Sequence, residues 1–159
     1  MDKVALLAAF RTQIQGLLVD LEKQQEAARS GTRVDGDHRP ENRGERAAVT
    51  TQGYLTLALG QRIAELRTHR DQLERIDPGP RTRITPGALF LAEDEDGDET
   101  WYLVLPGGQG ARLVQEDIEV LVVSPESPVV RSLAGLGAGD DGTLRRGDRV
   151  VEIEVLEVW

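Results

Sequence analysis

The apolar residues of this 159-residue chain follow two different spacings, and the change falls at Asp77-Pro78-Gly79-Pro80. Before this point, apolar residues recur every three or four positions, as they do on one face of an α-helix. After it, apolar and polar residues alternate, as they do in strands with one buried face. Because two prolines separate the patterns, we expect an α+β protein with a helical domain over residues 1–77 and a β domain over residues 81–159.

Two amphipathic helices are predicted in the first domain. Their apolar positions are Leu7, Phe10, Ile14, Leu17 and Leu21 in one helix, and Leu55, Leu59, Ile63, Leu66 and Leu73 in the other. The two seams predict an antiparallel coiled-coil hairpin with a tip over residues 29–42, which are too rich in glycine and charge to be buried. At 1.5 Å per residue, the hairpin is longer than a domain of about 80 residues can cover, so we expect its tip to reach solvent.

The second domain is predicted to be a small, mostly antiparallel sheet with one short helix. The strand patterns lie at residues 87–94, 99–106, 119–123 and 149–159. The first two patterns flank an acidic Asp-Gly sequence that is typical of a hairpin turn. Ser127 is a typical helix N-cap, Pro128 suits the first helical turn, and Gly135 suits the helix end.

The composition excludes several classes of function. There is no cysteine, and His38 and His69 are the only histidines, which excludes disulfides, thiol nucleophiles and zinc sites built from these residues. Residues 1–76 hold 12 basic and 11 acidic residues, whereas residues 77–159 hold 7 and 17. Neither part has a basic stripe, so we expect no direct, specific binding of DNA or RNA. With no cleavable signal pattern and no apolar run of spanning length, the chain is expected to be a soluble, cytoplasmic monomer with no membrane role.

Three aspartates near the first predicted turn resemble the start of a calcium-binding EF-hand loop. These are Asp94, Asp96 and Asp98, but the glycine is Gly97 instead of the sixth loop residue, and the twelfth position is Leu105 instead of glutamate. An acidic hairpin turn is the preferred interpretation.

Three carboxylates in the predicted tip leave two interpretations open. Asp35, Asp37 and Glu41 can satisfy free N–H groups at the start of the second helix, and the Asp-Gly pair favours a turn. Alternatively, carboxylates at the end of a long hairpin can be carried into a cavity of another molecule. Proteins bind Mg²⁺ through only one or two carboxylates together with water and phosphate, so such a tip could complete a magnesium site of a partner.

Several stretches resemble the bacterial transcript cleavage factors of the GreA/GreB type, and the resemblance covers nearly the whole chain. The most specific stretch is VVSPESPVVRSLAGLGAGD, residues 122–140, which is similar to the family's strand, Ser-Pro, short helix, Leu-x-Gly and Gly-Asp. The strand RVVEIEVLEV resembles the closing strand of the family. In GDHRPENRGERAAVTTQGYL, Glu41-Asn42 falls on the Glu-Asn pair of the family tip, and Gln52-Gly53 falls on a later Gln-Gly pair.

This resemblance implies a coiled-coil hairpin followed by a domain similar to FK506-binding proteins. Factors of this type dock that domain on bacterial RNA polymerase near the rim of its secondary channel and insert the hairpin. The tip acids then help to hold Mg²⁺ and its attacking water, and the polymerase itself cleaves the backtracked RNA. The resemblance implies that Asp37 and Glu41 are these acids, that Asn42 and Asp35 support the tip, and that the chain has no cofactor of its own and is not an enzyme.

One departure from the family pattern leaves the activity open. The family tip has Asp-x-x-Glu-Asn, whereas here Asp37 stands four residues before Glu41, and His38 occupies the expected aspartate position. Either a one-residue insertion lets Asp37 reach the metal, or the protein occupies the channel without promoting cleavage. The Pro-Glu-Asn-Arg sequence is also similar to less characterised Gre-like paralogues and to the regulator of nucleoside diphosphate kinase.

A third interpretation, a prolyl isomerase, depends on analogy of fold alone. Such an enzyme needs an apolar, aromatic-lined pocket. The β domain offers only Phe90, Trp101, Tyr102 and Trp159, and the adjacent pair must face opposite sides of a strand. This interpretation is therefore disfavoured.

Overall fold

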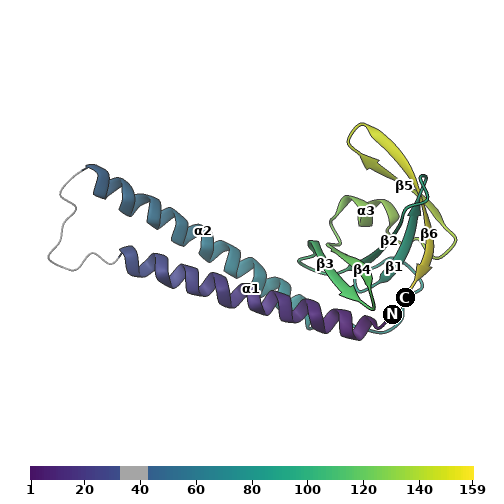
Figure 1. Ribbon diagram of the computed structural model, residues 1–159, viewed down its shortest axis with the longest axis horizontal. Coiled ribbons are helices and arrows are strands. Elements are labelled where there is room, and N and C mark those ends of the chain that lie inside the picture. Colours follow the sequence, from purple (N-terminus) through teal and green to yellow (C-terminus); the bar gives the residue numbers. More distant parts are fainter. Residues whose placement is uncertain (33–42) are drawn as a thin grey trace. The chain divides into compact units, whose positions relative to one another are not determined.

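The computed structural model describes the backbone of residues 1–32 and 43–159 and the side chains of residues 1–30, 50–145 and 147–159 (Figure 1). The chain divides into two compact units. The sheet unit comprises Met1–Arg11 and Asp71–Trp159, and the hairpin unit comprises Thr12–Arg70. This division differs from the one drawn at the prolines, because the start of one helix and the end of the other group with the sheet.

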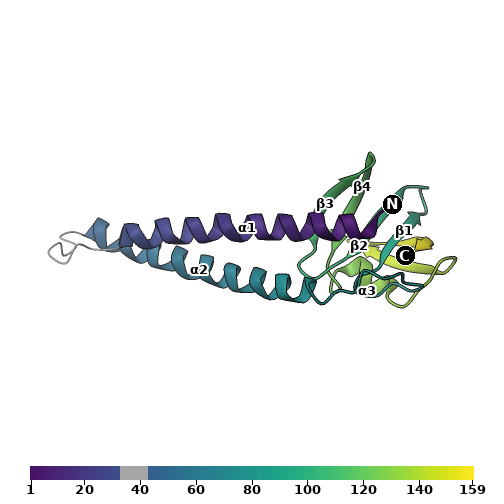
Figure 2. The ribbon, with the colours of Figure 1, turned by 90° about the horizontal axis from the view of Figure 1, so that it is seen from below.

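Two long antiparallel helices provide the hairpin. Helix α1 covers Lys3–Thr32 and helix α2 covers Arg43–Leu73, and the two lie side by side in both views (Figure 1, Figure 2). The Arg67 guanidinium donates to the Glu22 carboxylate over 2.7 Å, and the Gln25 side-chain amide donates to the Thr56 carbonyl over 3.2 Å. A later residue of α1 therefore contacts an earlier residue of α2, which confirms the predicted antiparallel hairpin.

The apolar seam differs from the predicted one at two positions. Leu17 is 44% exposed and Leu55 is 51% exposed, whereas Leu18 is buried and Thr56 is half-buried. The prediction assumed heptad spacing, but a straight α-helix with 3.6 residues per turn drifts by about 20° per heptad. In α1, a four-residue step from Ile14 to Leu18 compensates for this drift.

The sheet unit contains a six-stranded sheet in the order β3-β4-β2-β1-β6-β5. Its strands are β1 (Leu89–Asp94), β2 (Glu99–Val104), β3 (Gln109–Gln115), β4 (Ile118–Val123), β5 (Asp141–Arg146) and β6 (Arg149–Val158). Neighbouring strands are antiparallel except β2 and β4, which are parallel. With the short helix α3 (Pro128–Leu133), this arrangement confirms the predicted α+β class of a helical hairpin and a mostly antiparallel sheet.

The sequence does not predict β3 or β5, which are the two edge strands of the sheet. Among the described side chains, Leu113 is the only buried one in β3, and Leu144 is the only buried one in β5. An edge strand needs few buried side chains, so its alternation of apolar and polar residues is weak. Both strands also contain glycine and charged residues, which further weaken the strand pattern.

Both faces of the sheet are buried. On one face, the rings of Phe90 and Tyr102 stack with centroids 5.0 Å apart, and Val130 and Leu133 of α3 join the same cluster. The buried residues of the opposite face include Leu89, Leu91, Leu103, Val120 and Val122. The helix ends that belong to this unit contribute buried Leu6, Leu7, Phe10 and Leu73. In both views, the start of α1 lies beside the sheet, so the helix ends complete the core of this unit (Figure 1, Figure 2).

Helix α1 also has an unexpected property. By length and composition alone, its residues Lys3–Ser30 could cross a membrane, so the expectation that no segment is long and apolar enough is wrong on that criterion. Six of its apolar side chains are buried within the protein, namely Leu6, Leu7, Phe10, Ile14, Leu18 and Ala28. Core helices of soluble proteins meet the same criterion, so it does not assign α1 to a membrane.

Candidate functional site

The predicted tip residues Asp35, Asp37, Glu41 and Asn42 lie outside the described residues. The described chain reaches Thr32 at the end of α1 and resumes at Arg43 at the start of α2. The described residues nearest to this segment belong to the two helices of the hairpin unit.

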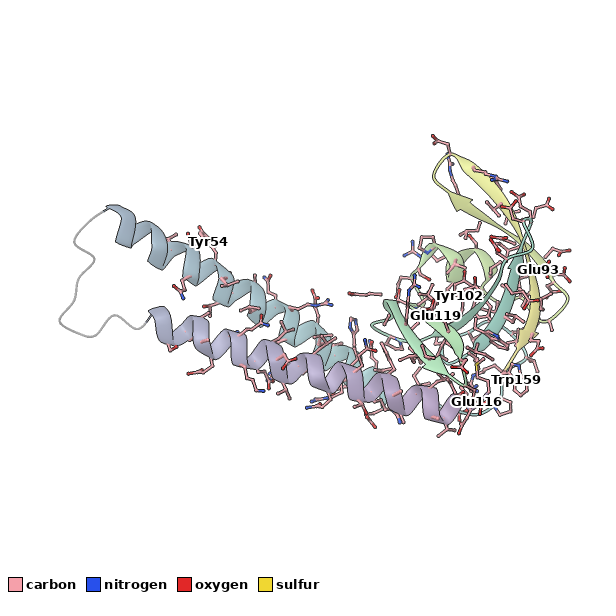
Figure 3. The ribbon with its side chains drawn as sticks, viewed as in Figure 1. Tyr54, Glu93, Tyr102, Glu116, Glu119 and Trp159 are labelled. Carbon is pink, nitrogen blue, oxygen red and sulfur yellow. The ribbon has the colours of Figure 1, made fainter. Side chains whose placement is uncertain are left out.

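A shallow groove of about 520 Å³ runs along the hairpin unit between its two helices. Its lining residues are Gln25, Arg29, Gly53, Thr56, Leu57, Gly60, Gln61 and Ala64. Near it, Tyr54 of α2 extends into solvent and is 70% exposed (Figure 3). The groove exists because glycine, threonine and alanine occupy positions where a packed helix pair would have larger apolar residues.

The segment of residues 122–140, which carries the most specific resemblance described above, forms the end of β4, helix α3 and the turn into β5. Ser127 caps α3, because its hydroxyl oxygen accepts from the Val130 N–H over 3.4 Å and Pro128 follows as the first helical residue. After the helix, the chain turns at Gly135 with a φ of 79°, and the Gly135 N–H donates to the Ile84 carbonyl over 2.9 Å. The predicted short helix and its cap are confirmed.

Replacing Ser127 with alanine is expected to lower the free energy of unfolding by about 1 kcal/mol, because the cap of α3 loses its side-chain acceptor. Urea denaturation followed by tryptophan fluorescence measures this change. Ser132→Ala is the matched control, since Ser132 is exposed within α3 and does not cap it. An equal loss in both variants would contradict a capping role for Ser127.

A row of carboxylates, which the sequence does not predict, crosses four strands of the sheet. Glu99 of β2 pairs with Glu93 of β1, Glu93 pairs with Glu154 of β6, and Glu154 pairs with Asp141 of β5. Figure 3 shows Glu93 at this place. Like charges directly opposite one another destabilise a sheet, so this row lowers stability and gives the surface a strongly negative potential. The excess of acidic residues after residue 76 was its only signal in the sequence.

The predicted acidic turn is confirmed. One carboxylate oxygen of Asp94 accepts from the backbone N–H groups of Asp96 and Asp98, over 3.3 and 3.2 Å, and the Gly97 N–H donates to the Asp94 carbonyl over 2.8 Å. The aspartate therefore organises a hairpin turn. Within the described part of the chain, no group of three or more histidine, cysteine, aspartate or glutamate residues is placed to hold a metal ion.

The aromatic residues of the sheet unit are engaged in packing. Phe90 is fully buried and Tyr102 is 8% exposed, and their rings stack on one another. Trp101 pairs with Leu91 and belongs to the opposite face of the sheet, as predicted for adjacent strand residues. Phe90 and Tyr102 are thus not free to line a ligand pocket, which argues against a prolyl isomerase.

A charged cluster joins the start of α1 to the segment after α2. The buried Lys3 ammonium donates to the Gly79 carbonyl over 2.6 Å and to the Trp159 carbonyl over 3.0 Å. Burial lowers the pKa of Lys3, and the nearby Arg81 guanidinium lowers it further. The hydrogen bond from the Gly79 N–H, followed by that from Arg81, lowers the pKa of Asp77 below its ordinary value of 3.8.

The lowered pKa of Asp77 predicts a dependence of stability on pH. Its stabilising effect is complete above the ordinary pKa and is lost as the pH falls through the lowered folded value. In urea unfolding, the stability difference between the wild type and Asp77→Asn should therefore be larger at about pH 6 than at about pH 2. A difference that stays constant over this range would show that the ionised carboxylate has no stabilising role.

No protein-family model matches the sequence, and a search of curated proteins finds no match either. Among solved structures, the chain is similar to the transcription factor Gfh1, with 18% identity, a TM-score of 0.40, and coverage of 93% of this chain and 92% of that one. Gfh1 from Thermus aquaticus gives 16% identity and a TM-score of 0.39, with 92% of each chain covered. A prokaryotic transcription elongation factor GreA/GreB from Nitrosomonas europaea gives 20% identity and a TM-score of 0.37, covering 58% of this chain and 78% of that one. These similarities carry no functional argument for this chain.

Proposed function

We propose that this chain binds bacterial RNA polymerase, inserts its hairpin into the secondary channel, and stimulates cleavage of backtracked RNA by the polymerase. The observation that supports this proposal most is the combination of two features in one chain. A helical hairpin carries the Glu41-Asn42 pair between its helices, and the family motif at residues 122–140 forms a capped helix within a mostly antiparallel sheet.

In this function, the chain supplies ligands and the polymerase supplies the catalytic centre. Asp37 and Glu41 donate carboxylate oxygens to an Mg²⁺ ion that the polymerase also holds, and Asn42 holds the loop or the attacking water. Carboxylate oxygens suit this role because Mg²⁺ prefers hard oxygen ligands and is bound through one or two of them. The chain is then a protein cofactor of the polymerase in the bacterial cytoplasm and not itself an enzyme.

The sheet unit serves as the docking domain in this proposal. The segment from Ser127 to Leu136 is the candidate contact region, because it carries the family motif. Several of its residues, including Val130 and Leu133, are needed in the core, so a contact must use the exposed side chains of α3 and its flanks.

A stalled, backtracked elongation complex tests the proposal. Added wild-type chain should speed the release of short 3′ RNA fragments in the presence of Mg²⁺. Release at the rate of the polymerase alone would contradict the cleavage activity.

A second candidate function is a channel regulator that binds without promoting cleavage. The observation that favours it is the shifted tip, in which Asp37 is four residues before Glu41 and His38 occupies the expected aspartate position. Such a protein should compete with an authentic cleavage factor for the polymerase and add no fragment release of its own. If the chain does not compete, both functions are excluded.

A further inference from the structure

The two ends of the hairpin unit are packed differently. In the base half, which we define as residues 12–22 and 61–70, the seam holds the buried residues Ile14, Leu18, Ile63 and Leu66. In the loop-side half, residues 23–30 and 50–60, Ala28 is the only buried residue among the described side chains. Because burial of large apolar side chains supplies most of the stability of a helix pair, the loop-side half is the weaker one.

Most large apolar side chains of the loop-side half of α2 are directed to solvent instead of the seam, and Leu59 is only half-buried. Tyr54, labelled in Figure 3, is 70% exposed. Leu57 is 62% exposed, and Leu55 is also exposed. The Thr56 hydroxyl donates to the Gln52 carbonyl over 2.9 Å, a contact within the helix that slightly destabilises and often bends it. Gly53 lowers the helix propensity further, so α2 gains little stability here from its own sequence.

A polar contact crosses the seam in this half. The Gln25 amide nitrogen donates to the Thr56 carbonyl over 3.2 Å. Gly60 provides the room for it, since a Cβ atom at this position would lie 2.9 Å from the Gln25 amide nitrogen. A polar residue at a seam position fixes the register of a coiled coil at a cost in stability.

We propose that the two helices separate locally, as one unit, in the loop-side half of the hairpin while they stay packed in the base half. When the helices pack again, the Gln25 contact beside Gly60 restores a single register. Local opening costs least where few apolar contacts are buried, and helical segments of about ten residues are not stable alone in water. This property belongs to the hairpin itself and holds whether or not the chain binds RNA polymerase. In the proposed function, the tip is attached to the loop-side half, and the walls of the surrounding polymerase channel can keep the two helices of that half together.

Amide hydrogen exchange of the full-length protein tests the difference between the two halves. Amides of residues 23–30 and 50–60 should exchange at least about 10-fold faster, after correction for intrinsic rates, than those of residues 12–22 and 61–70. Equal protection in both halves would overturn the proposal.

Two glycine substitutions of the same chemistry test the role of Gln25. At Gly53 an added Cβ meets nothing within 4 Å, so Gly53→Ala should slow exchange in the loop-side half by about 2- to 5-fold through helix propensity alone. At Gly60 the same change displaces the Gln25 amide, so Gly60→Ala should slow exchange less or accelerate it. If both substitutions slow exchange equally, the Gln25 contact has no role in closing the hairpin.

Discussion

Replacing both Asp37 and Glu41 with alanine is expected to reduce the release of 3′ RNA fragments from a backtracked elongation complex by at least about 100-fold relative to the wild-type chain. In the proposed function, these carboxylates supply oxygen ligands to Mg²⁺, and alanine supplies none. A time course of fragment release at saturating protein measures the loss. The single variants should distinguish the two acids, because the shifted position of Asp37 predicts a larger loss for Glu41→Ala than for Asp37→Ala.

Two exposed carboxylates of α1 provide controls for this experiment. Asp20→Ala and Glu26→Ala remove the same charge away from the tip and should leave fragment release unchanged. Binding of the double tip variant to the polymerase, measured by competition with an authentic cleavage factor, should persist. Fragment release by the double variant at the wild-type rate would show that the tip acids take no part.

Replacing Phe90 with alanine is expected to lower the free energy of unfolding of the sheet unit by about 3–5 kcal/mol. Phe90 is fully buried at the centre of the sheet, and its ring stacks on Tyr102 with centroids 5.0 Å apart. Alanine would leave a cavity and remove the stacking contact. Tryptophan fluorescence during urea unfolding reports on this unit, because Trp101 and Trp159 both belong to it.

The exposed Tyr54 provides the matched control for Phe90. Tyr54→Ala removes an aromatic ring of similar size from the surface of the hairpin unit and should change the free energy of unfolding by no more than about 0.5 kcal/mol. Phe90→Leu keeps most of the buried volume and should cost clearly less than Phe90→Ala. A loss below about 1 kcal/mol for Phe90→Ala would contradict the central place of this residue in the core.

The elements that the sequence predicts well are those with strong internal periodicity. Strand β6 alternates buried Val151, Ile153 and Val155 with glutamates, and the Ser127-Pro128 pair marks the start of α3. Strands β3 and β5 lie at the sheet edges and have too little alternation to be recognised. The wrong prediction of Leu17 as a seam residue has a different cause. A strict heptad count assumes about 3.5 residues per turn, so its predicted positions drift around a straight helix that has about 3.6 residues per turn.

The candidate site is less accessible to sequence reasoning than the fold. The carboxylate row needs the register of four strands, and Glu99, Glu93, Glu154 and Asp141 are far apart in the sequence. The Gln25 contact needs the pairing of two helices. The tip acids come from resemblance alone, since spacing does not separate a helix cap from a metal ligand, and they lie outside the described residues.

A cross-linking measurement tests the central proposal, entry of the hairpin into RNA polymerase, most directly. Because the chain has no cysteine, Asn42→Cys offers a single attachment point for a photoreactive group at the tip, and Glu126→Cys offers one in the sheet unit. We expect the tip probe to cross-link to polymerase peptides at the active centre, and the sheet probe to peptides near the channel rim. Cross-links from the tip probe only to the outer surface of the polymerase, or none at all, would contradict the proposed function.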